Sequence, residues 1–188
     1  MRAVCSLHNH SSCSDGELAP GQLLAYLRHA GYNVIAITDH MEHTIPHELQ
    51  MPEDVVFIDG IEWWHRHLGF ELVSLGLKGD NPTLSDATIS WVAHPALYDW
   101  PMSTYIKAMK SVEGIYGLEW MNSGIAQFQP YELEEIFREC HPHFFNVDDF
   151  HIRGQEKMSW IEMDVDSLDK DTILETLISG DYWLESKR

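Results

Sequence analysis

Short apolar runs alternate with amphipathic stretches along this chain, and the alternation constrains the fold more than any other feature. The run at 33–38 (NVIAIT) is typical of a strand buried on both faces. Before it, the stretch at 20–30 places Leu23, Leu24 and Leu27 on one helix face. Other strand-like runs lie at 3–7, 54–64, 70–77, 89–95, 114–121 and 143–151, and other helix-like stretches at 102–110, 130–140 and 169–179. The runs at 54–64 and 70–77 could pair as a hairpin across 65–69 (HRHLG). The pattern predicts an α/β fold with a largely parallel sheet.

Length and composition favour one globular domain that covers residues 1–188. The chain is 44% hydrophobic, but it has no apolar run that approaches the ~20 residues of a membrane span. The first ten residues become polar too early for a signal peptide. Three scattered cysteines fit reduced thiols better than a disulfide framework. We therefore expect a soluble cytoplasmic protein, and the sequence leaves its oligomeric state unknown.

The formal net charge of −18 excludes two classes of partner. A nucleic-acid surface needs lysines and arginines to replace counterions, so we expect no nucleic-acid partner. An anionic membrane is disfavoured for the same reason. A small anionic substrate fits such a chain if local cations neutralise the site, and bound metals would do so.

Histidine is the unusual residue, with 12 copies. The segment 6–16 (SLHNHSSCSDG) holds His8, His10 and Asp15 within a short space directly after the first predicted strand. A polar turn is the plainer interpretation, and a metal site is the sharper one. Roughly one His-x-His pair is expected by chance at this frequency, so the position of each pair must decide.

Histidines and carboxylates recur where the predicted strands end. They are His8, His10, His40, Glu62, His94, Glu119, Asp149 and His151. The carboxyl ends of strands carry the chemistry of α/β folds. Residues two apart in an extended segment share a face, so His8 and His10 can bind one ion, as can Asp149 and His151. A mixed nitrogen and oxygen set suits Mn, Fe or Zn better than Mg or Ca.

Five motifs in order resemble the PHP family, named for polymerase and histidinol phosphatase. They are LHNHSSCSDG (7–16), AITDH (36–40), GIE (60–62), AHP (93–95) and VDDFH (147–151). The resemblance covers the chain from the first strand to the last. It implies a distorted seven-stranded (β/α) barrel of TIM-like type, with two or three divalent metal ions at its C-terminal face.

The resemblance also implies which residues bind metal. His8 and His10 match the ligands of the first ion, with Glu62 as a bridge and Asp149 completing the centre. Asp15, His40 and His151 match the ligands of another ion, although an Asp-Gly turn is the plainer interpretation of Asp15. His94 matches a ligand of the remaining site. Among these residues, we expect His40, Glu62, Asp149 and His151 to carry catalysis.

One departure concerns the site of His94. The family has a histidine where this chain has Val73, in the stretch LVSLG (72–76). Two interpretations follow. Either this site is weak or empty, or His65 or His67 reaches into it from the preceding turn.

We expect a metal-dependent phosphoesterase that hydrolyses a small phosphorylated metabolite or nucleotide through a metal-activated hydroxide. Arg153 is the candidate to hold a phosphate oxygen, or it is an ordinary solvated arginine. One alternative is an amide or ester hydrolase, because the same hydroxide can attack carbon. The other is a metal-binding or regulatory domain that has lost catalysis.

Overall fold

A computed structural model describes residues 1–41, 51–79, 82–98 and 100–187. The strands are β1 (Arg2–Ser6), β2 (Val34–Ile37), β3 (Val56–His65), β4 (Phe70–Leu75), β5 (Ile89–Val92), β6 (Ile115–Asn122), β7 (Ile125–Ala126), β8 (His143–Val147), β9 (Ser159–Asp164) and β10 (Trp183–Ser186). The helices are α1 (Pro20–His29), α2 (Met102–Ser111), α3 (Pro130–Glu139) and α4 (Lys170–Ser179), with short 3-10 turns at Leu84–Asp86 and Pro95–Tyr98.

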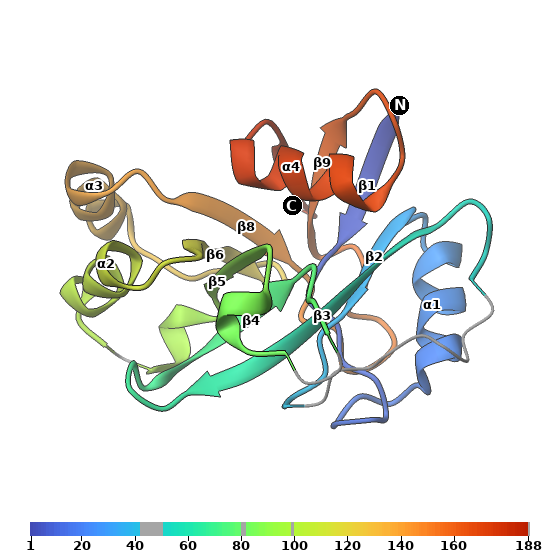
Figure 1. The fold of residues 1–188 in the computed structure, drawn as a ribbon, viewed down its shortest axis with the longest axis horizontal. Coiled ribbons are helices and arrows are strands. Elements are labelled where there is room, and N and C mark those ends of the chain that lie inside the picture. The colour runs from blue at the N-terminus through green and yellow to red at the C-terminus, as the bar shows by residue number, and fades with distance from the viewer. Residues whose placement is uncertain (42–50, 80–81, 99, 188) are drawn as a thin grey trace.

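The strands form one sheet in the order β10-β9-β1-β2-β3-β4-β5-β6-β7, with β8 also paired to β6. The sheet curls into a half-barrel (Figure 1). Two side-chain bonds link β8 to the far end of the sheet. Asn146 donates to the Glu185 carbonyl in β10, and the Ser159 hydroxyl donates to the Val147 carbonyl. The ends of the sheet therefore lie beside each other.

The predicted α/β class is confirmed, but the largely parallel sheet is wrong. β3, β4 and β5 pair antiparallel, and so do β1, β9 and β10. The turn from β3 to β4 is too short to hold the crossover that parallel strands require. The seven-stranded (β/α) barrel is likewise not confirmed. The strand β9 was not predicted, and it follows the last predicted strand.

Three helices pack on the outside of the curled sheet (Figure 1), whereas α4 contributes Ile173, Leu174 and Leu177 to the apolar core inside it. In Figure 1, α2 and α3 lie side by side on one flank, and α1 lies on the opposite one. The apolar face of α1 buries Leu23, Leu24 and Leu27 against Ile35 and Ile37 of β2. A separate apolar core fills the inside of the curl, where the Trp91 and Phe145 rings stack with centroids 4.3 Å apart. Because apolar side chains fill the inside of the curl, polar groups are left to gather at the ends of the strands.

Candidate metal centre

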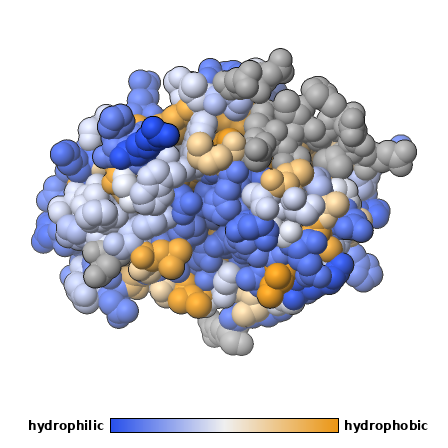
Figure 2. Space-filling view, turned by 90° about the horizontal axis from the view of Figure 1, so that it is seen from below, coloured by the Kyte–Doolittle hydropathy of each residue, from blue (hydrophilic) through white to orange (hydrophobic). Residues whose placement is uncertain are grey.

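Histidines and carboxylates from five strands converge at one end of the curled sheet. His8, His10 and Asp15 follow β1, His40 follows β2, Glu62 lies in β3, His94 follows β5, and Asp149 and His151 follow β8. Parallel pairing of β1 with β2 and of β2 with β3 brings the first three groups to the same edge. Figure 2 looks at the molecule from below Figure 1 and shows hydrophilic side chains gathered at the centre of this face, with hydrophobic ones around them.

Side chains in the segment after β1 point alternately to opposite sides, and this explains the His-x-His pattern. His8 and His10 point into the cluster and are fully buried. Asn9 points the other way, where its amide donates to the Ser6 and Ala36 carbonyls. The segment is thereby tied to β2 while both imidazoles face the same space. Gly16 closes the following loop, because a Cβ there would lie 2.0 Å from the His10 carbonyl oxygen.

The inner centre consists of four atoms: His8 Nε2, His10 Nε2, Glu62 Oε2 and Asp149 Oδ1. The two nitrogens are 3.1 Å apart. His8 Nε2 lies 3.1 Å from the Glu62 oxygen and 3.4 Å from the Asp149 oxygen. For His10 Nε2 these distances are 3.2 and 3.3 Å. Atoms at such separations can share one ion at bond lengths of about 2.0–2.2 Å.

Both oxygens of the inner centre are buried and lack a hydrogen-bond partner. Buried polar atoms are normally satisfied, so two unpaired carboxylate oxygens that face two imidazoles fit a cation-binding site. The donor set, two nitrogens and two carboxylate oxygens, is the kind that binds zinc, iron or manganese. The residues therefore fit the metal that the sequence predicts.

The charges of the inner centre depend strongly on one another. Burial opposes a charge on His8, but Glu62, Asp149 and Glu119 outweigh burial and raise its pKa well above the usual value. Burial likewise opposes a charge on His10, but the facing carboxylates of Asp149 and Glu62 raise its pKa to about 9. Burial disfavours the Glu62 carboxylate, yet the facing histidines lower its pKa well below the usual value. Protons thus occupy the positions where a cation would act.

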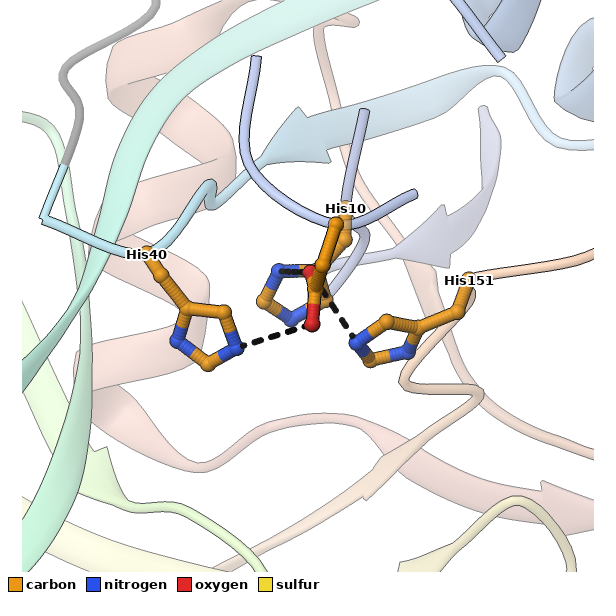
Figure 3. Close-up of side chains that lie close together, drawn as sticks. His10, His40 and His151 are labelled. Atoms are coloured by element: carbon orange, nitrogen blue, oxygen red, sulfur yellow. Dashed lines mark ion pairs between the residues drawn. The ribbon is translucent and has the colours of Figure 1, made fainter. Parts of the chain in front are cut away.

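The outer set consists of His10, Asp15, His40 and His151, whose candidate ligand atoms all lie within 4.8 Å of one another. The imidazoles of His10, His40 and His151 lie around one carboxylate, that of Asp15 (Figure 3). Its oxygens are 3.4 Å from His151 Nε2 and 3.6 Å from His40 Nε2. Asp15 is 56% exposed, so this set opens to solvent.

The hairpin site consists of Glu62, Glu71 and His94, and the sequence analysis missed Glu71. His94 Nε2 lies 2.9 Å from Glu62 Oε1 and 3.6 Å from Glu71 Oε2. Glu71 pairs across the β3–β4 hairpin with Trp64, and Val73 pairs with Glu62. Paired residues share a face, so Glu71 and Val73 both point inward. The strand period of two, counted from Val73, was the signal that could have found Glu71.

His65 and His67 do not reach the hairpin site. His65 lies three residues after Glu62 in β3, on the opposite face, and pairs with Phe70. Its Nδ1 accepts a hydrogen bond from the Leu68 amide in the turn. Within the part of the chain that the structure describes, neither histidine belongs to a cluster able to hold a metal.

Glu119, in β6, orients the His8 ring from the side opposite the inner centre. Its fully buried carboxylate accepts from Trp91 Nε1, the His94 amide and Asn122 Nδ2, at 3.2, 2.6 and 2.9 Å. Its Oε1 is also 2.7 Å from His8 Nδ1. A carboxylate on the far nitrogen fixes the tautomer and orientation of a metal-binding histidine. Glu119 therefore directs His8 Nε2 toward the inner centre.

The adjacent acids Asp148 and Asp149 have different surroundings. Asp149 faces the inner centre, as its spacing from His151 predicts. Asp148 turns away and is buried, where it accepts from the Tyr32 hydroxyl and from the amides of residues 157–159. The φ angle of Asp149 is 50°, in the left-handed region that side chains rarely adopt. His94 also has a positive φ, of 24°, so backbone strain is concentrated at the cluster.

Arg153 lies at the surface, two residues beyond His151. Its guanidinium forms an ion pair with Glu17, and its amide donates to the same carboxylate. Its side chain is 54% exposed. Whether it binds phosphate stays a prediction.

Comparisons of sequence find no relative: no family model matches the chain, and no curated protein is similar enough to be counted as a match. Comparison of structure does find similar folds. A two-domain protein from Bacteroides vulgatus, described as containing a predicted PHP-like metal-dependent phosphoesterase, matches 99% of this chain with a TM-score of 0.75 at 16% identity. The chain spans 65% of that protein's length.

Two other similar structures are described as enzymes of other kinds. An amidohydrolase from Chromobacterium violaceum matches 81% of this chain and 89% of its own, with a TM-score of 0.61 at 15% identity. A lesion-specific endonuclease from Pyrococcus furiosus matches 98% of this chain and 58% of its own, with a TM-score of 0.64 at 13% identity. The PHP resemblance is thus confirmed at the level of the fold. Within the described ranges, no helix is long and apolar enough to cross a bilayer.

Proposed function

We propose that this chain is a metal-dependent hydrolase that cleaves phosphoric esters of a small metabolite or nucleotide. One observation carries the proposal: two orphaned, buried carboxylate oxygens converge with two imidazole nitrogens at 3.1–3.4 Å. Such an arrangement is costly without a cation, because buried charges must be compensated.

The inner centre would hold one ion, and the outer set would hold a second at the solvent side. His10 joins them, since its Nε2 belongs to the inner centre and its Nδ1 lies 3.6 Å from Asp15. Divalent ions placed close together lower the pKa of water and neutralise charge on a phosphoryl group. The exposed edge at Asp15 is the side from which a substrate can approach.

The protein's own residues provide orientation and charge. Glu62 offers one oxygen to the inner centre and the other to His94, so it connects the two sides of the cluster. Asn122 donates to Asp149 Oδ2 at 3.0 Å and leaves Oδ1 free for the centre. Arg153 could contact a phosphate oxygen by exchanging Glu17 for the substrate. These placements leave His40 and His151, at the solvent edge, nearest to an incoming ester.

Two further observations support a phosphoesterase over other activities. The similar Bacteroides protein is described as containing a predicted PHP-like metal-dependent phosphoesterase. The net charge of −18 disfavours the long nucleic acid on which an endonuclease acts. The second candidate is an amide or ester hydrolase, which the similar amidohydrolase and the pairing of Arg153 with Glu17 favour.

The test combines metal analysis with hydrolysis on one sample. Protein purified without chelator is analysed for Mn, Fe and Zn, then assayed on a phosphomonoester, a phosphodiester, an ester and an amide. Metal together with phosphate release that His10→Ala abolishes and His65→Ala retains supports the proposal. Turnover of the ester or amide alone would establish the second candidate. Bound metal without any turnover would establish a binding domain.

A further inference from the structure

Glu71 occupies a position that a purely structural acid would not need. It lies in β4, and its side chain is 22% exposed. One carboxylate oxygen is 3.6 Å from His40 Nδ1, and the other is 3.6 Å from His94 Nε2. The candidate ligand atoms of His40, Glu62 and Glu71 all lie within 4.8 Å of one another. Two carboxylates this close repel each other unless a cation lies between them.

Tyr98 fixes the positions of the Glu71 and His94 side chains relative to each other. Its hydroxyl donates to Glu71 Oε2 at 2.6 Å and accepts from the Glu71 amide at 3.3 Å. The same oxygen is 3.2 Å from His94 Nδ1. A phenol has only one proton to donate, and the carboxylate takes it. Nδ1 of His94 must therefore be the donor to Tyr98.

This proton arrangement determines what the other nitrogen of His94 can do. In a neutral imidazole, a proton on Nδ1 leaves Nε2 as an acceptor. Nε2 then faces two more acceptors, Glu62 Oε1 at 2.9 Å and Glu71 Oε2 at 3.6 Å. A proton on Nε2 would satisfy only the nearer of these two oxygens, that of Glu62. A cation is the group that satisfies all three.

We propose that Glu71 supplies the ligand that Val73 lacks, and that the hairpin site binds a divalent cation with Tyr98 as its positioning residue. Because two of the three ligands are carboxylates, Mn²⁺ suits this site better than it suits the inner centre, where half of the ligands are imidazoles. The inference rests on the proposed metal-dependent function for its context, but its test measures metal binding alone.

The experiment titrates metal-free protein with Mn²⁺ and separately with Zn²⁺, and counts bound equivalents by calorimetry and elemental analysis after gel filtration. Glu71→Gln removes the charge and keeps the shape, so we expect it to lose one Mn²⁺ equivalent and to retain the Zn²⁺ of the inner centre. Tyr98→Phe keeps all ligands but frees Glu71, so we expect the same equivalent to bind about 10-fold more weakly. Both variants are checked for folding by circular dichroism.

Two controls match these changes. Glu139→Gln makes the same substitution at a surface acid that pairs with Lys110 between α2 and α3, and we expect wild-type binding. His65→Ala with His67→Ala tests whether the hairpin tip supplies the ligand, and we expect no loss. Unchanged Mn²⁺ binding in Glu71→Gln would overturn the inference, as would loss of the equivalent in the histidine double variant.

The outcome is separable from the proposed function. If wild-type protein releases no phosphate but Glu71→Gln still loses its Mn²⁺ equivalent, the hairpin site stands and the phosphoesterase proposal fails. If phosphate is released and Glu71→Gln binds Mn²⁺ as wild type does, the reverse holds. Should Glu71→Gln fail to fold, the affinity change in Tyr98→Phe decides, because that variant changes no ligand.

Discussion

The inner centre and the hairpin site share Glu62 but are assembled differently. The inner centre takes its histidines from one extended segment after β1 and its aspartate from the segment after β8. The hairpin site takes two acids from strands that pair antiparallel. The first offers two nitrogens and two oxygens and is deeply buried, whereas the second offers one nitrogen and two carboxylates and is partly open at Glu71. Spacing within one segment places the two histidines of the inner centre side by side, whereas the register of β3 against β4 brings the two acids of the hairpin site together.

The largest expected effect is that of His10→Ala, which removes a nitrogen shared by the inner centre and the outer set. We expect at least one metal equivalent to be lost and hydrolysis to fall by more than about 100-fold, beyond the effect of losing a residue that only orients a ligand. Elemental analysis and initial rates measure both. His65→Ala is the matched control, and retained metal in His10→Ala would remove the inner centre from the mechanism.

The second prediction is pH dependence of metal binding. In the metal-free protein the pKa of His10 is raised to about 9, so below pH 9 an ion must displace its proton. Lowering the pH from 9 to 6 should therefore weaken Zn²⁺ binding, by up to about tenfold per unit for each proton displaced. Calorimetry in buffers of different ionisation enthalpy counts the protons released. Affinity independent of pH would mean that Zn²⁺ binds elsewhere.

A smaller effect is expected from Glu119→Gln, which weakens the group that orients His8. The amide retains one acceptor but loses the charge that faces His8 Nδ1 at 2.7 Å. We expect Zn²⁺ affinity to fall about 10–100-fold, with Mn²⁺ binding at the hairpin site less affected. Equal loss at both sites would show that Glu119 acts on the whole cluster, because it also accepts from the His94 amide.

The smallest effect on metal binding is expected from Asp148→Ala. This change removes the acceptor of the Tyr32 hydroxyl and of the Met158 and Ser159 amides, and it leaves the Lys157 amide with the Tyr32 hydroxyl alone. The free energy of unfolding should fall by about 3 kcal/mol, because unpaired buried donors are costly. Denaturant unfolding measures the loss, and metal content should stay at the wild-type value. Asp149→Ala, the neighbouring control, should lose metal instead.

The sequence predicted most of the residues that the structure brings together. All eight predicted metal ligands lie in the inner centre, the outer set or the hairpin site. Their positions after apolar runs made this possible, because parallel strands β1, β2 and β3 end at one edge. Their roles as ligands remain predictions. Glu71 was missed because it lies at the start of β4, and the start of an antiparallel strand reaches the edge at which the parallel strands end.

The local sequence determined which segments form strands and helices, and which residues two apart share a face. Periodicity and turn residues act over a few positions, so a single sequence reveals them. The turn residues between β3 and β4 indicated a hairpin, and only the tertiary structure decided that β5 pairs antiparallel with β4 and that Glu71 faces His94. It also gave Asp148 its role in the scaffold, as acceptor for the Tyr32 hydroxyl and the amides of residues 157–159. Register and side-chain contact join residues far apart in the chain, and they depend on how the whole sheet curls.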